Sequence, residues 1–159
     1  MSNSQSSIRM IDVGAKPVSL RTARASGRLV ARAETIRRIR AGELEKGDAV
    51  ATARLAGIMA AKKTSDVIPL CHPLPLDAVE IAIGFEPEAV VIEATVRATA
   101  RTGVEMEALV AVSAAALAIY DMTKSVDPGM TITAVQLEEK TGGVRGDYAR
   151  EQPQGAKEA

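Results

Sequence analysis

Asp121 and Lys124, near the end of a long apolar segment, have the spacing of a pair that could exchange protons. Residues three apart on a helix project from neighbouring points of its surface. Exposed ion pairs of this kind contribute about 0 to 1 kcal/mol, so the spacing also fits a purely structural pair. If burial or neighbouring cations lowered the pKa of the lysine toward neutrality, the pair could exchange protons with a ligand.

The single cysteine and the single histidine are adjacent in a loop that contains three prolines, Ile68-Pro-Leu-Cys-His-Pro-Leu-Pro75. The prolines prevent a regular helix and impose extended backbone. Two adjacent ligands without a second cluster do not build a tetrahedral metal site, so we predict no metal centre. Cys71 and His72 could be structural, or they could form a rigid wall that presents an imidazole and backbone groups to a ligand.

Two carboxylates flank Met106 where the long apolar segment begins. Glu105 completes the capping-box pattern Thr102-Gly-Val-Glu105, which predicts a structural role at a helix start. Glu107 has no such role, and its carboxylate could accept the amino and ring N–H groups of a guanine-like base.

Three segments have residues suited to binding phosphate. Lys46-Gly47-Asp48 precedes a predicted helix, and the backbone N–H groups and dipole of a helix start favour anions. The pair Lys62-Lys63 and the run from Lys140 to Gly146 add cations and flexible backbone, although glycine-rich runs are also ordinary loops.

Hydrophobic periodicity predicts the elements that position these residues. The predicted strands are 29–33, 76–85, 89–101 and 130–137, and the predicted helices are 33–40, 48–62 and 102–126. Glu86-Pro87-Glu88 joins two of the strands into an antiparallel hairpin. The order predicts an α+β fold, a ferredoxin-like split βαβ sandwich with an antiparallel sheet and helices packed on one face. We expect a single domain, 1–159, with an ordered core of about 10–148 and disordered polar tails.

Composition excludes several classes of protein. Twenty basic and twenty acidic residues cancel, so no general attraction to nucleic acid or to an anionic membrane is expected. The scarcity of aromatic residues argues against stacking of single-stranded nucleic acid. No internal disulfide, secretory signal or membrane span is predicted, so a cytoplasmic location is expected.

One distance constrains the site. Glu107 and Asp121 are 14 residues apart on one predicted helix, which corresponds to about 21 Å. One small reacting centre cannot touch both, so we predict a site shared between two subunits whose helices pack antiparallel about a twofold axis. The alanines that would permit this close approach are Ala111, Ala114, Ala115 and Ala118.

Four motifs in order resemble the MoaC family, the family of cyclic pyranopterin monophosphate synthases. They are Lys46-Gly-Asp-Ala-Val-Ala-Thr-Ala-Arg-Leu-Ala-Gly-Ile-Met-Ala-Ala-Lys62, Ile68-Pro-Leu-Cys-His-Pro73, Thr102-Gly-Val-Glu-Met-Glu-Ala-Leu109 and Ile119-Tyr-Asp-Met-Thr-Lys124. The similarity extends from about Met10 to Tyr148.

The resemblance implies a phosphorus–oxygen lyase of molybdenum cofactor biosynthesis. It would convert 3′,8-cyclo-7,8-dihydroguanosine 5′-triphosphate into cyclic pyranopterin monophosphate and pyrophosphate. No cofactor is required, although a divalent cation such as Mg²⁺ could accompany the triphosphate. The implied assembly is a homohexamer, a trimer of dimers. The implied catalytic residues are Asp121 as general acid/base, its partner Lys124, and Lys46, which contacts phosphate. The implied substrate-binding residues are Leu70, Cys71, His72, Glu105, Met106, Glu107 and Arg21.

Three positions depart from the family pattern. Thr123 stands where the family usually has cysteine, and Gly14 stands where it usually has serine. In the glycine run the usual basic residue is replaced by Val144, with Arg145 following, so the cation that reaches the phosphates is left open.

A different class of function is a nucleotide-binding sensor that binds a triphosphate without turnover. Reversible binding of intact GTP would favour the sensor, whereas turnover of the cyclised intermediate would favour the synthase. An RNA-recognition module on the same topology is disfavoured by the missing strand aromatics and the zero net charge.

Overall fold

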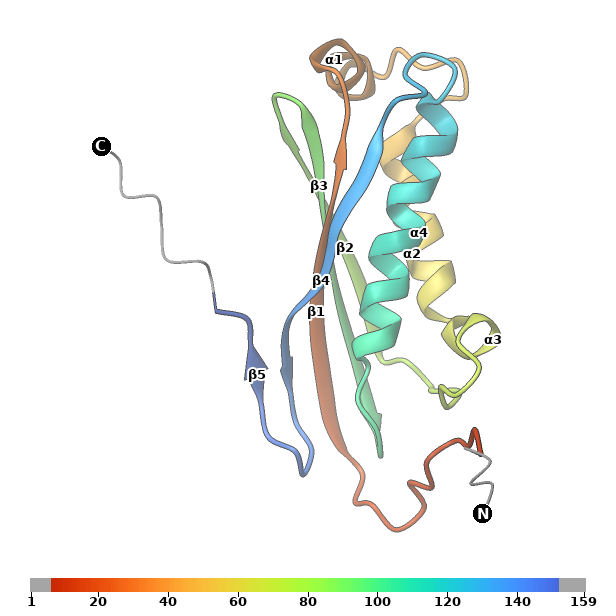
Figure 1. Cartoon of the computed structure of the whole chain (residues 1–159), viewed down its shortest axis with the longest axis vertical. Coiled ribbons are helices and arrows are strands. Elements are labelled where there is room, and N and C mark those ends of the chain that lie inside the picture. Colours follow the sequence, from red (N-terminus) through yellow and green to blue (C-terminus); the bar gives the residue numbers. More distant parts are fainter. Residues whose placement is uncertain (1–6, 152–159) are drawn as a thin grey trace, which may run out of the picture.

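The computed structural model describes residues 7–151 as a five-stranded antiparallel sheet with helices on one face (Figure 1). The strand order is β2-β3-β1-β4-β5. The strands are β1 (Ser19–Val30), β2 (Ala78–Glu86), β3 (Ala89–Ala100), β4 (Thr131–Thr141) and β5 (Tyr148–Ala149). The helices are α1 (Ala33–Ala41), α2 (Ala49–Ala61), α3 (Thr64–Val67) and α4 (Glu105–Thr123).

The connections confirm the predicted α+β class and the split βαβ order. β1 and β3 are neighbours in the sheet, with β2 on one side of them and β4 on the other. The helices α1 to α3 connect β1 to β2, and α4 connects β3 to β4. Each helical connection therefore crosses over a strand of the other unit, which is the arrangement that the element order predicted.

The prediction for the first strand was wrong. β1 covers Ser19–Val30 and pairs with β3 along its length, from Ser19 opposite Ala100 to Val30 opposite Ala89. Its inward face includes Ala23, Ala25 and Gly27, all buried by the helices. Alanine and glycine are weak strand formers, so this buried face carries no hydrophobic signal of its own and depends on its two neighbouring strands.

Small residues allow the helices to lie close to the sheet and to each other. A Cβ added at Gly57 of α2 would lie 3.0 Å from the carbonyl oxygen of Ala111 in α4. A Cβ added at Gly27 of β1 would lie 2.5 Å from Val112 Cγ1 of α4. Because glycine has no side chain at either point, α4 packs directly on both β1 and α2.

The apolar side chains of α4 are explained by its packing against the sheet and α2. By length and composition α4 could span a membrane, but 50% of its apolar window is buried inside the molecule. Such burial is typical of a core helix. Its last turn is held by Thr123, which stands where the resemblance expected cysteine and whose buried hydroxyl donates to the carbonyl of Ile119 at 2.7 Å.

Helix starts are only partly as predicted. Asp48 caps α2, because its Oδ1 accepts the N–H of Ala51 at 2.9 Å. The predicted capping box at Thr102–Glu105 does not form: α4 begins after Val104, which makes no side-chain cap. Glu105 pairs with Lys140 of β4 instead, at 2.8 Å, so a contact distant in sequence replaces the local one.

The C-terminal part is more ordered than predicted. β4 reaches Thr141, and Tyr148–Ala149 forms the short edge strand β5 at the boundary of the predicted tail. The remaining predictions of disorder concern mainly residues 1–6 and 152–159, which lie outside the described residues.

Candidate active site

A pocket of about 430 Å³ lies where the proline-rich loop meets the start of α4. We call it the mixed pocket, because carboxylate, imidazole, thiol and apolar groups line it together. Its lining includes all six residues that the sequence singled out in this region: Leu70, Cys71, His72, Glu105, Met106 and Glu107. The loop and the helix start, more than thirty residues apart in the chain, therefore form one concave surface, as predicted.

Glu107 is the buried acid of the mixed pocket, with only 4% of its surface exposed. Burial raises the pKa of this carboxyl above its ordinary value, and the nearby charge of Glu105 adds to the effect. Burial also raises the pKa of the Cys71 thiol, with a smaller contribution from Glu107. The thiol is therefore kept protonated, and a ligand with N–H donors would relieve the cost of a buried carboxylate.

A second pocket adjoins the mixed pocket and shares Lys16, Thr102, Gly103, Glu105 and Arg145 with it. We call it the cationic pocket. Its lining contains five basic residues: Lys16, Arg21, Arg101, Lys140 and Arg145. Glu105 is the one acid among the residues that line it. The excess of positive charge suits a polyanion such as a phosphate chain.

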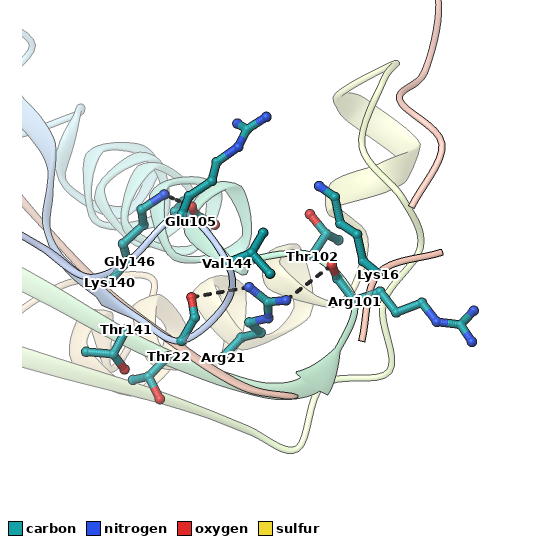
Figure 2. A pocket seen from close by; sticks show the side chains of 13 residues that line it. Lys16, Arg21, Thr22, Arg101, Thr102, Glu105, Lys140, Thr141, Val144 and Gly146 are labelled. Carbon is teal, nitrogen blue, oxygen red and sulfur yellow. Dashed lines mark hydrogen bonds and ion pairs between the residues drawn. The ribbon is translucent and has the colours of Figure 1, made fainter. Parts of the chain in front are cut away.

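Arg21 forms part of the cationic pocket, where Figure 2 shows its guanidinium tied to the backbone. Nε, Nη1 and Nη2 donate to the carbonyls of Ala100, Gly142 and Arg101 at 3.3, 3.2 and 3.3 Å. An arginine has five N–H donors, so two remain for a ligand. Arg21 thus joins the end of β3 to the glycine run after β4.

The glycine run needs its glycines because Arg21 lies against it. Gly143 has φ +92°, and a Cβ there would lie 1.5 Å from Arg21 Nη1. No other residue fits both the left-handed backbone and this close approach. The run places Val144 and Arg145 at the cationic pocket, and Arg145 also lines the mixed pocket. Arg145 is therefore the cation of this run that can face a ligand in either pocket.

Sequence reasoning missed Lys16 and Arg101. It named Lys140 only as one of the cations of the glycine run and did not predict its pairing with Glu105. Lys140 Nζ lies 2.8 Å from Glu105 Oε1, with both side chains less than a third exposed. Arg101-Thr102-Gly103 connects a strand to a helix, and such a turn could have signalled a phosphate site. Nothing in the sequence around Lys16 indicates its place in the pocket.

Lys46, Asp121 and Lys124 form a separate group, here called the ion cluster. Asp121 Oδ2 lies 2.7 Å from Lys46 Nζ, and Asp121 Oδ1 lies 2.8 Å from Lys124 Nζ. Lys46 Nζ also donates to the Asp121 carbonyl at 3.0 Å. The three side chains are about half exposed. Lys46 comes from the α1–α2 loop, so the fold brings together three predicted catalytic residues from two segments.

Charge pairing sets the protonation of the ion cluster. The ammonium groups of Lys124 and Lys46 lower the pKa of Asp121 to about 2. Asp121 in turn raises the pKa of Lys124. The condition under which Lys124 would exchange protons readily, a pKa lowered toward neutrality, is therefore not met in this chain. Lys124 is a charged ammonium here, suited to donate a proton or to bind an anion.

The mixed pocket and the ion cluster lie at opposite ends of α4, the helix drawn vertically in Figure 1. Glu107 is in its first turn and Asp121 in its last, so the 14-residue separation of about 21 Å applies. The predicted alanine stripe was partly wrong. Ala111 and Ala115 are 0% exposed because they pack inside the same chain, and only Ala114 and Ala118 of that set are partly exposed.

Among residues 7–151, no three histidine, cysteine, aspartate or glutamate side chains lie close enough together to hold a metal ion. Cys71 and His72 therefore have no further partners of these types for a metal centre in this part of the chain. The arrangement can instead hold N–H donors at Glu107 and anionic groups at the cationic pocket, two neighbouring sites for the two ends of one polar ligand.

The MoaC family model matches residues 10–143, which include the ion cluster and most of the residues that line the two pockets, but not Arg145. The chain belongs to the MoaC family. A cyclic pyranopterin monophosphate synthase of Streptomyces griseus is 55% identical over 147 residues, 92% of this chain and 83% of the relative. Cyclic pyranopterin monophosphate synthase 1 of Mycobacterium tuberculosis is 57% identical, over 89% and 84% of the two chains. A cyclic pyranopterin monophosphate synthase of Brevibacillus brevis is 51% identical, over 93% of each.

Proposed function

We propose that this chain is a cyclic pyranopterin monophosphate synthase, a lyase of molybdenum cofactor biosynthesis. Its substrate would be the cyclised dihydro-GTP intermediate, and its products cyclic pyranopterin monophosphate and pyrophosphate. Membership of the MoaC family supports this activity. The observation that carries it is the junction of the mixed and cationic pockets, which share Glu105 and Arg145 and together suit a purine-derived base joined to a triphosphate.

The base would lie in the mixed pocket. The Glu107 carboxylate would accept the amino and ring N–H groups of the guanine-derived ring. A buried carboxylate needs hydrogen-bond donors of this kind, because burial removes it from water. His72 and the backbone of Leu70 and Cys71 would form the facing wall. A ligand that satisfies Glu107 would gain binding energy there, because the cost of burying the carboxylate is already present in the free protein.

The triphosphate would lie along the cationic pocket. Arg21 retains two N–H donors, and Arg145 and Lys140 add charge that would offset the negative charge developing on pyrophosphate as it leaves. Formation of the cyclic phosphate requires a substrate hydroxyl oxygen to bond to the α-phosphorus while the bond to pyrophosphate breaks. The hydroxyl proton must pass to a base at that step.

Proton transfer is assigned to the ion cluster. Lys124 would donate protons, as its charged state allows, and Asp121 would accept them. With a pKa of about 2 the free Asp121 is a weak base. If the phosphates attract Lys46 and Lys124, the pKa of Asp121 would rise toward its ordinary value and make it a better proton acceptor. Substrate binding would thereby activate the base.

If the mixed pocket and the ion cluster act on one substrate, their separation of about 21 Å calls for a second subunit. We propose that the mixed pocket of one subunit faces the ion cluster of another, in a homo-oligomer that is a hexamer built as a trimer of dimers. The partly exposed face of α4, with Ala114, Leu117 and Ala118, is available for such a contact. The finer assignments that go with the family are also proposals: a ferredoxin-like sandwich, a cytoplasmic location, no required cofactor, and Mg²⁺ only as a companion of the triphosphate.

The direct test is an assay with the cyclised dihydro-GTP intermediate that follows both pyrophosphate and pterin product. Asp121→Asn and Lys124→Ala should abolish turnover. Glu80→Gln is a matched control, because Glu80 is an exposed carboxylate on β2 whose one ion pair within residues 7–151 is 3.9 Å long. It should leave turnover unchanged.

Absence of turnover by a well-folded oligomer would contradict the proposal. If that protein also bound intact GTP reversibly, the sensor would be the better explanation. Turnover that survives Asp121→Asn would leave the activity standing and refute the role of the ion cluster.

A further inference from the structure

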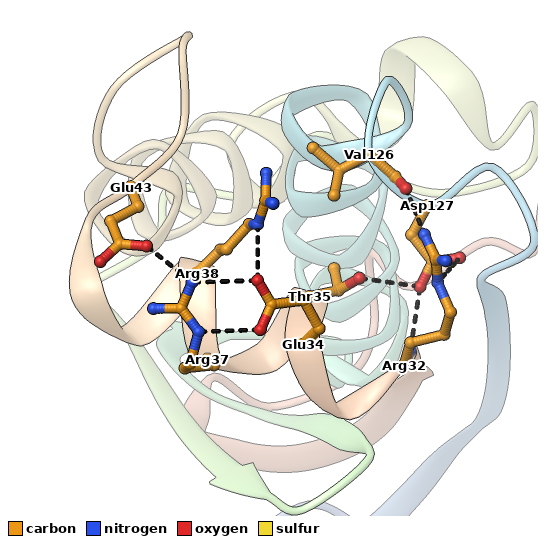
Figure 3. A network of polar contacts seen from close by, with 8 residues as sticks. All are labelled: Arg32, Glu34, Thr35, Arg37, Arg38, Glu43, Val126 and Asp127. Atoms are coloured by element: carbon orange, nitrogen blue, oxygen red, sulfur yellow. Dashed lines mark hydrogen bonds and ion pairs between the residues drawn. The ribbon is translucent and has the colours of Figure 1, made fainter.

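Asp127 is a buried carboxylate that lies outside both pockets and outside the ion cluster. It is 5% exposed and sits in the loop between α4 and β4. Its Oδ2 accepts the backbone N–H of Arg32 at 2.9 Å and the hydroxyl of Thr35 at 3.0 Å, and Arg32 Nε lies 3.3 Å from Oδ1 (Figure 3). All these donors belong to the beginning of α1, 92 or more positions away.

Asp127 takes the place of an N-cap for α1. Arg32, the residue before the helix, provides no side-chain cap of its own. The Asp127 carboxylate offsets the positive end of the helix dipole and accepts one of the backbone N–H groups there. These hydrogen bonds lower the pKa of Asp127, and the bond from the Arg32 N–H has the largest effect. Asp127 is therefore charged at neutral pH. The Arg32 guanidinium also donates to the Val126 carbonyl, which adds a second link to the same loop.

The two joined segments are those that supply the ion cluster. Asp127 N–H donates to the Thr123 carbonyl at 3.0 Å, which ties it to the last turn of α4, beside Asp121 and Lys124. On the other side, α1 leads through Gly42 into the turn that carries Lys46. Glu43 N–H donates to the Arg38 carbonyl at 2.9 Å where α1 ends, and Gly47 N–H donates to the Leu44 carbonyl at 3.0 Å across the turn itself.

We propose that Asp127 is a positioning residue for the ion cluster: by holding the start of α1 against the end of α4, it sets where Lys46 meets Asp121. Lys46 Nζ contacts both the carboxylate and the backbone carbonyl of Asp121, at 2.7 and 3.0 Å, so this two-point contact depends on how the loop that carries Lys46 lies against the end of α4. This inference rests on the proposed function, because it assigns Asp127 a part in the same reaction.

Matched controls exist on the same helix. Glu34 also serves α1, but it pairs with Arg37 and Arg38 on the exposed side and makes no ion pair with α4 or its loop (Figure 3). Glu34→Ala therefore tests a loss of α1 ion pairs without a loss of the link to α4. Asp127→Asn keeps the size and the acceptor oxygen, whereas Asp127→Ala removes both.

The experiment compares the kcat and KM of these full-length variants on the cyclised dihydro-GTP intermediate, normalised to folded oligomer. Asp127→Ala should lower kcat on the order of tenfold, because small misplacements of reacting groups cost this much or more. KM should stay within about twofold, since the pockets are untouched. Asp127→Asn should restore most of kcat, and Glu34→Ala should match the unmodified protein.

A merely structural role would lower the melting temperature without separating kcat from KM. If Asp127→Ala does not fold, the double variant Arg32→Ala/Thr35→Val removes the side-chain donors and should show the same selective loss of kcat. An unchanged kcat in whichever of these variants folds would overturn the inference, as would an equal rise in KM. Absence of turnover by the unmodified protein would instead refute the proposed function.

Discussion

Subunits that are inactive for different reasons should restore activity to one another if the site is shared. We would combine Glu107→Gln, which alters the mixed pocket, with Asp121→Asn, which alters the ion cluster at the other end of α4. Their separation of about 21 Å along a rigid helix means that one reacting centre cannot contact both residues of the same chain. A mixed dimer then contains one site with both changes and one site with neither.

The expected recovery follows from this count. With random mixing half of the dimers are mixed, and half of the sites in those dimers are intact, so activity should reach about a quarter of the unmodified level. The variants would be refolded together, native mass spectrometry would verify mixed oligomers, and pyrophosphate release would measure activity.

The matched control mixes Glu107→Gln with Glu105→Gln, because both changes lie at the mixed pocket. Every site of such a mixed dimer carries one altered residue, so no recovery is expected. If verified mixed oligomers of the first pair recover no more activity than the control, the shared site is refuted. A monomer with full activity would refute it equally.

Further predictions concern single residues. Glu107→Gln should raise the melting temperature more at neutral pH than in mild acid, because only the ionised carboxylate is costly to bury. The sign follows because burial raises the pKa of Glu107 in the folded state, so the native protein loses stability as pH rises through that pKa. An equal effect at both pH values would contradict this. Gly143→Ala should destabilise the fold by roughly 1 to 3 kcal/mol in thermal or urea unfolding, because φ is +92° and Arg21 occupies the space. Unchanged stability would show that Arg21 moves freely. Lys140→Ala should raise KM about tenfold or weaken pyrophosphate binding by a similar factor in calorimetry, through loss of one charge in the cationic pocket. A change in kcat alone would place Lys140 elsewhere in the reaction.

The sequence by itself predicted the features that depend on neighbouring residues. The cap at Asp48, the hairpin at Glu86-Pro87-Glu88 and the helix that carries Glu107 and Asp121 depend on residues within a few positions of one another. Nearby residues therefore suffice to predict them. The separation of Glu107 from Asp121 follows in the same way, since the rise of a helix is constant.

Tertiary structure decided the rest, because it depends on partners distant in the chain. β1 forms between β3 and β4 although its buried face consists largely of alanine and glycine. Glu105 pairs with Lys140, 35 positions away, and does not form the predicted capping box. A hydrogen bond to a charged partner in a half-buried site is stronger than the local bond to a backbone N–H. Ala111 and Ala115 face the interior, and Asp127 finds its donors on α1. Such contacts have no local pattern, and only the packing of the sheet against its helices creates them.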